Sequence, residues 1–240
     1  MHTLRTFAAA ALLAAAVPLH AQTFATTTAL PAAVADGGAS CAAAGAPTDL
    51  TIPVTGITRP LAGLSVRIGL SATHAGDATV ELIAPGGAPG MPLVSRIGAN
   101  GALSPGDSSD FSGVYTFVDP SVSSNSIWSA AMGADGTTAI PAGTYYTSAP
   151  GGSSSATGAP VPLLATFSGL APAQINGNWT LRVTDLCQRD DVTVHDVASL
   201  TLTQAPPPAG TAAVPTHSEW ALALLALVCA ALGLRRARRA

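Results

Sequence analysis

Short runs in which apolar and polar residues alternate strictly constrain this chain more than any other feature. Four such runs stand out, at residues 64–70, 79–83, 179–184 and 198–203. A period of two is typical of β-strands that bury one face and expose the other. The chain also has 24 glycines and 19 prolines, many of them clustered between these runs, where they mark turns and interrupt helices. We therefore predict an all-β fold, a jelly-roll-like antiparallel β-sandwich without helical segments.

The rest of the chain divides into segments of distinct composition. We expect the sandwich to occupy residues 41–204, preceded by a low-complexity segment at residues 22–40 and followed by a proline-rich linker at residues 205–213. Residues 22–45 and 121–160 are rich in Ala, Ser, Thr and Gly and lack apolar periodicity. We expect long polar loops in both stretches.

The N-terminus has the layout of a secretory signal peptide. His2 and Arg5 precede the apolar run Phe7–Val17, and the small residue Ala21 follows at a plausible cleavage point. A buried helix would need some polar residues on one face, and this run has none. We predict that residues 1–21 are a signal peptide, which makes the export machinery a partner of the chain.

The C-terminal segment, residues 214–240, combines three parts. A short motif ends at Trp220, the uncharged run Ala221–Leu234 follows, and four arginines lie between residues 235 and 239. The fifteen apolar residues from Trp220 would span about 22 Å as a helix, less than a hydrocarbon core of about 30 Å, so length alone equally fits a short buried helix. The arginines favour a single transmembrane helix, because they can reach the headgroups and hold this end in the cytoplasm.

This arrangement resembles the bacterial IPTL-CTERM sorting tail, whose motif reads Ile-Pro-Thr-Leu-Ser-Glu-Trp-Gly. The positions that match it are Pro215, Thr216, Ser218, Glu219 and Trp220. The positions that depart from it are Val214, His217 and Ala221, and His217 in place of Leu is the largest departure. The resemblance implies transient anchoring in the inner membrane, cleavage by a membrane sortase-like enzyme, and delivery to the cell surface or the medium.

Three landmarks follow one another along the expected sandwich. The first is the turn His74-Ala75-Gly76-Asp77 before an alternating strand, and the second is Asp110-Phe111 with Phe117-Val118-Asp119. The third is the run from Trp179 to Asp185, preceded by Phe167-Ser168-Gly169 and followed by the strand Ser199–Leu202. In this order they resemble the P domain (P/Homo B domain) of proprotein convertases and bacterial subtilisin-like proteases.

The resemblance implies a non-catalytic jelly roll that accompanies a serine endopeptidase in proteolysis. In that family His74, Gly76 and Asp77 correspond to a structural turn. The departures from the family pattern are Ala78 for Leu, Ala84 for Ser and Ala198 for Trp. Residues 22–40 are far too few for a catalytic domain, so any protease would be a separate protein.

The exported body contains only two cysteines, Cys41 and Cys187, because Cys229 lies in the apolar tail. Two cysteines in an oxidising compartment usually pair, so we predict a disulfide between them. The alternative is two independent free thiols.

Several aspartates lie at turns or strand ends, and among them Asp110, Asp119 and Asp185 are candidate calcium ligands. Calcium takes hard oxygen ligands from loops, and P domains sometimes bind it. The equally good alternative is that these carboxylates cap turns and keep the surface soluble. No loop has the calcium-binding pattern Asp-x-Asp-x-Asp-Gly.

Residues 22–213 hold five arginines, no lysine and twelve acidic residues, which gives 5 − 12 = −7. An acidic body without clustered cations is a poor partner for nucleic acid or for an anionic membrane surface.

Evidence for catalysis in the sequence is negative. The body has only two histidines after the signal peptide, His74 and His195, and neither lies in a Gly-x-Ser-x-Gly or metal-binding motif. We interpret Trp179 as a core residue, and the pair Tyr145-Tyr146 as a loop in which one ring faces solvent, either packing locally or contacting a ligand.

Three functions therefore compete. The first is a non-catalytic module, sorted to the surface, that contributes binding or structural support outside the cell. The second is an accessory P domain that acts with a separate subtilisin-like serine endopeptidase. The third is an enzyme of a type that the sequence does not reveal.

Overall fold

The computed structural model describes residues 20–99, 101, 103–134, 136, 138–147, 160–208, 224 and 227–228. The chain divides into two compact units, residues 1–205 and residues 206–240. The strands of the first unit are β1 (His20–Ala25), β2 (Ala32–Ala33), β3 (Thr48–Val54), β4 (Leu61–Ala72), β5 (Ala78–Ile83), β6 (Gly90–Ser95), β7 (Asp110–Val118), β8 (Ala139–Ile140), β9 (Gly143–Tyr146), β10 (Gly177–Asp185) and β11 (Thr193–Gln204). Its helices are the 3-10 helix η1 (Ala39–Cys41) and the α-helices α1 (Ile127–Ala134), α2 (Leu163–Phe167) and α3 (Pro172–Ile175).

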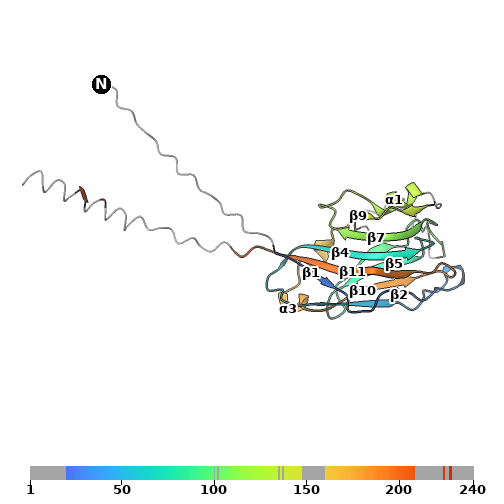
Figure 1. The fold of residues 1–240 in the computed structure, drawn as a ribbon, viewed down its shortest axis with the longest axis horizontal. Coiled ribbons are helices and arrows are strands. Elements are labelled where there is room, and N and C mark those ends of the chain that lie inside the picture. The colour runs from blue at the N-terminus through green and yellow to red at the C-terminus, as the bar shows by residue number, and fades with distance from the viewer. Residues whose placement is uncertain are drawn as a thin grey trace, which may run out of the picture. The chain divides into compact units, whose positions relative to one another are not determined.

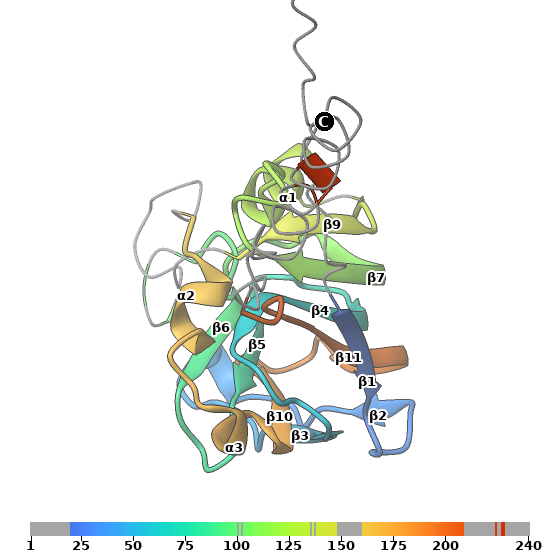
Figure 2. The ribbon, with the colours of Figure 1, turned by 90° about the vertical axis from the view of Figure 1, so that its left-hand side faces the viewer.

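The strands form two sheets that lie face to face (Figures 1 and 2). The seven-stranded sheet has the order β1-β11-β4-β7-β8, with β2 also on β11 and β9 also on β7, and the four-stranded sheet has the order β3-β10-β5-β6. Strand pairing is antiparallel except where β7 meets β8 and β9. The predicted all-β sandwich is confirmed at this level.

The core lies between the two sheets and follows the alternation in the sequence. In β4, Val66, Ile68 and Leu70 are fully buried, whereas Arg67 between them is exposed. In β10, Trp179 is fully buried, its ring centroid lies 5.1 Å from that of Phe167, and its Nε1 donates to the Ile175 carbonyl at 2.8 Å. Satisfying the indole N–H inside an apolar core lets the largest side chain pack there without an unpaired donor.

The described part of residues 121–160 contains regular structure where we expected a long polar loop, whereas residues 148–159 lie outside the described residues. Helix α1 buries Ile127, Trp128, Ala131 and Ala134, which lie on one face at helical spacing. The strands β8 and β9 follow it and pair with β7. The expectation failed because alanine and serine give a weak apolar signal. The prediction that the sandwich has no helical segments was likewise wrong.

The segment at residues 22–40 also contributes to the sandwich. Strand β1 pairs with β11 over six residues, from His20 opposite Gln204 to Ala25 opposite Ser199. Only Gln22 and Phe24 of β1 are even half-buried. Backbone pairing at a sheet edge therefore defines this strand, and its apolar content was too low to predict it.

The predicted signal peptide and the predicted sorting tail lie mostly outside the described residues. Of the predicted signal peptide only His20 and Ala21 are described, and they begin β1. Of the predicted membrane-spanning run, Leu224, Leu227 and Val228 are described as helical and exposed. Among the described residues, no helix combines the length and the apolar character that crossing a membrane requires.

Candidate functional site

A disulfide joins Cys41 and Cys187, as predicted, and these residues are 8% and 5% exposed, respectively. Cys41 ends η1 and Cys187 follows β10, and the two Cα atoms lie 4.2 Å apart. The backbone reinforces the link, because the Gly37 N–H donates to the Cys187 carbonyl at 3.1 Å. The bridge thus fastens the segment before β3 to the end of the strand at the centre of the smaller sheet.

The turn His74–Asp77 lies beside this bridge, between β4 and β5. Its backbone is held by the Ala75 N–H, which donates to Ser109 at 2.8 Å, and by the Gly76 N–H, which donates to Asp107 at 2.9 Å. A Cβ atom on Gly76 would lie 2.2 Å from the Pro105 carbonyl oxygen. Only glycine fits where the two segments of backbone come this close.

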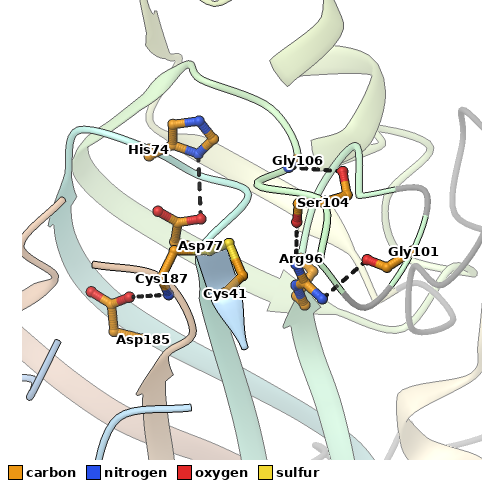
Figure 3. Close-up of a disulfide and its surroundings, with 9 residues drawn as sticks. All are labelled: Cys41, His74, Asp77, Arg96, Gly101, Ser104, Gly106, Asp185 and Cys187. Carbon is orange, nitrogen blue, oxygen red and sulfur yellow. Dashed lines mark hydrogen bonds and ion pairs between the residues drawn. A yellow bond between two sulfur atoms is a disulfide. The ribbon is translucent and has the colours of Figure 1, made fainter. Parts of the chain in front are cut away.

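Asp77 and Asp185 place two buried carboxyl groups at the bridge (Figure 3). They lie at neighbouring ends of paired strands, since Asp185 ends β10 opposite Ala78 of β5. Asp77 is 1% exposed and Asp185 is fully buried. The Asp185 Oδ1 accepts the Cys187 N–H at 3.0 Å, and the Leu186 N–H donates to the Asp77 carbonyl at 3.0 Å. We call Cys41, His74, Asp77, Asp185 and Cys187 the disulfide centre.

Each carboxyl group of the disulfide centre keeps one oxygen without a hydrogen bond. These oxygens are the Asp77 Oδ1 and the Asp185 Oδ2. The His74 Nδ1 lies 3.6 Å from the Asp77 Oδ1, which is ion-pair range but too long for a hydrogen bond. Buried and partly unsatisfied carboxylates are costly to keep charged.

The pKa values of both groups rise accordingly. Burial raises the pKa of Asp77 to about 6, repulsion from Asp190 and Asp36 adds to the rise, and the positive charge of Arg96 opposes it. Burial likewise raises the pKa of Asp185 to about 6, against the lowering effect of the Cys187 N–H. The two carboxyl groups also repel one another when both are charged.

Arg96 is the positively charged residue that opposes the rise in the pKa of Asp77. It follows β6, its N–H donates to the Ala78 carbonyl at 3.2 Å, and its guanidinium donates to the carbonyls of Gly101 and Ser104. The guanidinium therefore organises the loop after β6 while it offsets the charge of Asp77.

The two carboxyl groups of the disulfide centre can hold protons, and both are buried. Below about pH 6 the carboxyl groups take up protons, and above it they charge. A hydrolytic acid–base pair must reach a bound substrate. Side chains that are 1% and 0% exposed have no such access.

The three candidate calcium ligands do not lie together. Asp110 and Asp119 are at opposite ends of β7, and Asp185 is in the disulfide centre. Within the described residues, one set of three potential ligands has its atoms within 4.8 Å of one another, namely Cys41, Asp77 and Cys187, and the disulfide occupies both of its sulfurs.

Asp119 instead has the geometry of a turn cap. Its carboxylate accepts from the Ser121 N–H at 3.1 Å, the Ser121 hydroxyl at 2.8 Å and the Leu164 N–H at 3.2 Å. Burial raises the pKa of Asp119, but these three hydrogen bonds outweigh it, and the pKa falls below its ordinary value. This is the alternative role that the sequence left open.

His74 and His195 lie in different surroundings. His195 is next to a bulge of β11 and packs over Gly69 of β4, and its Nδ1 lies 2.8 Å from the Asp196 carboxylate. The side chain of Asp196 is 75% exposed. His195 therefore hydrogen-bonds to an exposed carboxylate, whereas His74 belongs to the disulfide centre.

Little in the sequence indicated this centre. Asp77 was assigned to a structural turn and Asp185 to a candidate metal ligand, and nothing in their spacing indicated that they share one buried site. The surrounding charges of Asp36, Asp190 and Arg96 were missed as well.

The family model for the IPTL-CTERM motif matches residues 212–239. This agrees with the tail at residues 214–240 and its motif residues, which lie outside the described part of the chain. The motif indicates a sorting tail of the kind that a membrane enzyme processes, with export and surface sorting. No curated protein matches the chain.

Proposed function

We propose that this chain is an exported, surface-sorted, non-catalytic module that contributes binding or structural support outside the cell. The observation that carries the proposal is the IPTL-CTERM match at residues 212–239, directly after a disulfide-closed β-sandwich. Export would begin with the predicted signal peptide. Transient anchoring in the inner membrane and cleavage by a sortase-like enzyme would follow.

Two features of the sandwich support this route. A disulfide is typical of proteins that fold in an oxidising compartment. In addition, His20 at the start of β1 pairs with Gln204 at the end of β11. The chain therefore enters and leaves the sandwich at the same end, which suits a domain that is tethered at both termini during export.

The experiment compares processing of the wild type with two variants of the tail. Trp220→Ala removes a motif residue and should leave the tail uncut, so the full-length chain accumulates in the membrane fraction. His217→Leu restores the residue of the family motif and should raise the processed fraction. Equal processing of all three proteins would contradict the proposed route.

We also propose that the sandwich is a jelly-roll relative of the proprotein convertase P domain. Two of the motifs that carry this resemblance, the turn with Asp77 and the strand that ends with Asp185, lie far apart in the sequence and meet at the disulfide centre. Their meeting at one buried site supports a shared structural role.

That relationship favours a second function, as an accessory domain of a separate subtilisin-like serine endopeptidase. The test is to mix the exported sandwich with such a protease that lacks a P domain and to measure the thermal inactivation of the protease. Slower inactivation supports the accessory role, whereas an unchanged rate together with no binding contradicts it.

The module itself is proposed to hydrolyse nothing. Casein hydrolysis and labelling by a serine-directed fluorophosphonate are the measurements, on protein whose fold is verified by circular dichroism. Stoichiometric labelling of one serine that His74→Ala or His195→Ala abolishes would contradict the non-catalytic assignment.

A further inference from the structure

A surface pocket of about 480 Å³ lies between strand β9 and the N-terminal part of helix α1. Both elements lie beyond β7, at the edge of the seven-stranded sheet (Figures 1 and 2). The residues that line it are Ser124, Asn125, Ser126, Ser129, Ala130, Tyr145 and Tyr146. We call it the β9 pocket. Its volume lies within the range of roughly 300–1,000 Å³ that small-molecule sites occupy.

The lining of the β9 pocket is polar and carries no charge. It combines one carboxamide, three serine hydroxyls and two phenols, with no arginine, histidine or acidic side chain. Ser124, Asn125 and Ser129 are exposed. Hydroxyl and amide groups both donate and accept hydrogen bonds, so they suit a ligand that is itself rich in hydroxyl groups. An anionic ligand would find no counter-charge among these side chains.

The backbone of β9 is closed to an added strand. On the edge away from β7, the Thr144 carbonyl accepts from the Ser123 hydroxyl and from the Asn125 side-chain amide, each at 3.2 Å. The Tyr146 N–H donates to the Asn125 carbonyl at 2.9 Å. Extended peptides that dock on a sheet edge need these groups free. A ligand in the pocket can therefore contact side chains, because the outward backbone groups of β9 already form hydrogen bonds within the protein.

The two tyrosines of the pocket differ: Tyr145 forms a buried wall, and Tyr146 presents a partly exposed ring. Tyr145 is 6% exposed, and its hydroxyl donates to the Pro141 carbonyl at 2.6 Å. Burial raises the pKa of Tyr145, so the wall stays neutral. Tyr146 is half-buried and pairs with Val118 in β7. A partly exposed aromatic ring presents a flat apolar surface beside a polar tip, which complements the C–H face and the hydroxyl edge of a pyranose ring.

We propose that the β9 pocket binds a neutral oligosaccharide, with Tyr146 stacking on one sugar ring and Ser129 bonding its hydroxyls. This deepens the proposed function, because it names a ligand class for the exported module and rests on that module acting by binding. Asn125 links the pocket to β9 through its hydrogen bond to the Thr144 carbonyl, and Ser124, which also lines the pocket, is exposed.

The test is calorimetric titration of the processed, disulfide-bonded protein with four probes, namely cellotetraose, maltotetraose, mannotetraose and tetra-N-acetylchitotetraose. We expect saturable binding of at least one probe, with affinity unchanged between low and high salt. Tyr146→Ala should weaken that binding about tenfold or more, and Ser129→Ala about fivefold. The matched control is Ser108→Ala, because Ser108 lines a different pocket. This variant should bind the probes like the wild type.

Several results would overturn this inference. They are the absence of saturable binding to all four probes, binding that Tyr146→Ala leaves unchanged, and tighter binding of an oligouronate with strong salt dependence. Thermal melting of each variant verifies its fold. Surface delivery is measured separately, so a delivered protein that binds no probe contradicts the pocket alone, and a binding protein that is never exported contradicts the proposed function alone.

Discussion

The disulfide centre and the β9 pocket both gather polar side chains, yet they hold them in opposite ways. In the disulfide centre the carboxyl groups of Asp77 and Asp185 are 1% and 0% exposed, and each keeps an oxygen without a hydrogen bond. In the β9 pocket Ser124 and Ser129 are exposed around a hollow of about 480 Å³. Buried polar groups act on the stability of the fold, whereas exposed ones remain free to meet a ligand. Substitutions in the disulfide centre should therefore change stability, whereas substitutions in the β9 pocket should change ligand binding.

Among the substitutions, removing the bridge should have the largest effect on stability. Cys187→Ser opens a link between residues separated by 146 positions, and losing a native disulfide typically costs about 2–4 kcal/mol of the free energy of unfolding. Urea unfolding measures the loss, and circular dichroism should show nearly unchanged strand content. An unchanged melting temperature would show that the bridge does not stabilise the centre.

The buried carboxyl groups should make stability depend on pH. Asp77 and Asp185 hold a proton more tightly when folded, because burial raises the pKa of each from 3.8 to about 6. The unfolded chain therefore binds fewer protons than the folded one between these values, and the free energy of unfolding falls as the pH rises through this window. At about 1.4 kcal/mol for each pKa unit, the shift of each carboxyl group corresponds to a fall of about 3 kcal/mol.

Urea unfolding between pH 3.5 and pH 7.5 measures this dependence. Two variants test whether the buried carboxyl groups cause it. Asp185→Asn should make the pH profile shallower without flattening it, since the carboxamide does not titrate and Asp77 still does. Asp196→Asn, whose side chain in the wild type is 75% exposed, is the control and should keep the wild-type profile. A profile that rises through this pH window would contradict the buried-carboxyl account.

Two glycine substitutions should have effects of opposite sign. In Gly76→Ala the new Cβ would lie 2.2 Å from the Pro105 carbonyl oxygen, beside the disulfide centre, so the turn must shift, and we expect a loss of about 1–3 kcal/mol. In Gly133→Ala the new Cβ meets nothing within 4 Å in α1 beside the β9 pocket, and the helix should gain up to about 1 kcal/mol. Thermal melting compares them, and a Gly76→Ala protein as stable as the wild type would contradict the packing described for Gly76.

The smallest effect on stability is expected in the β9 pocket. Ser129→Ala removes an exposed hydroxyl, so the free energy of unfolding should stay within about 0.5 kcal/mol of the wild type. Chemical unfolding checks this directly. A loss as large as that of Gly76→Ala would mean that Ser129 supports the fold, and the contrast between the two regions would fail.

The sequence was informative where side chains alternate or where few pairings are possible. β4, β5, β10 and β11 were predicted because inward residues such as Val66 and Leu181 recur at every second position. The disulfide was predicted because Cys41 and Cys187 are the only cysteines in the exported body. Trp179 was predicted to be a core residue for its place at the head of an apolar face, and it is fully buried.

The rest depends on contacts between distant segments. Strand β1 exists through its pairing with β11, and α1 through the packing of Ile127 and Trp128, so neither stands out in local composition. Asp185 looked like an exposed ligand because it ends a strand, whereas the fold buries it beside Asp77. For the β9 pocket the only signal in the sequence was the pair Tyr145-Tyr146, whose meeting with Asn125 depends on tertiary structure.

The central claim is that this sandwich is delivered to the surface as a closed, processed module, and intact-mass spectrometry of the protein recovered outside the cell tests it most directly. We predict a mass that lacks residues from Met1 to about Ala21 and the arginines at residues 235–239, and that rises by the mass of two hydrogens on reduction as the Cys41–Cys187 bridge opens. A chain recovered from the medium with its C-terminus intact would contradict the account.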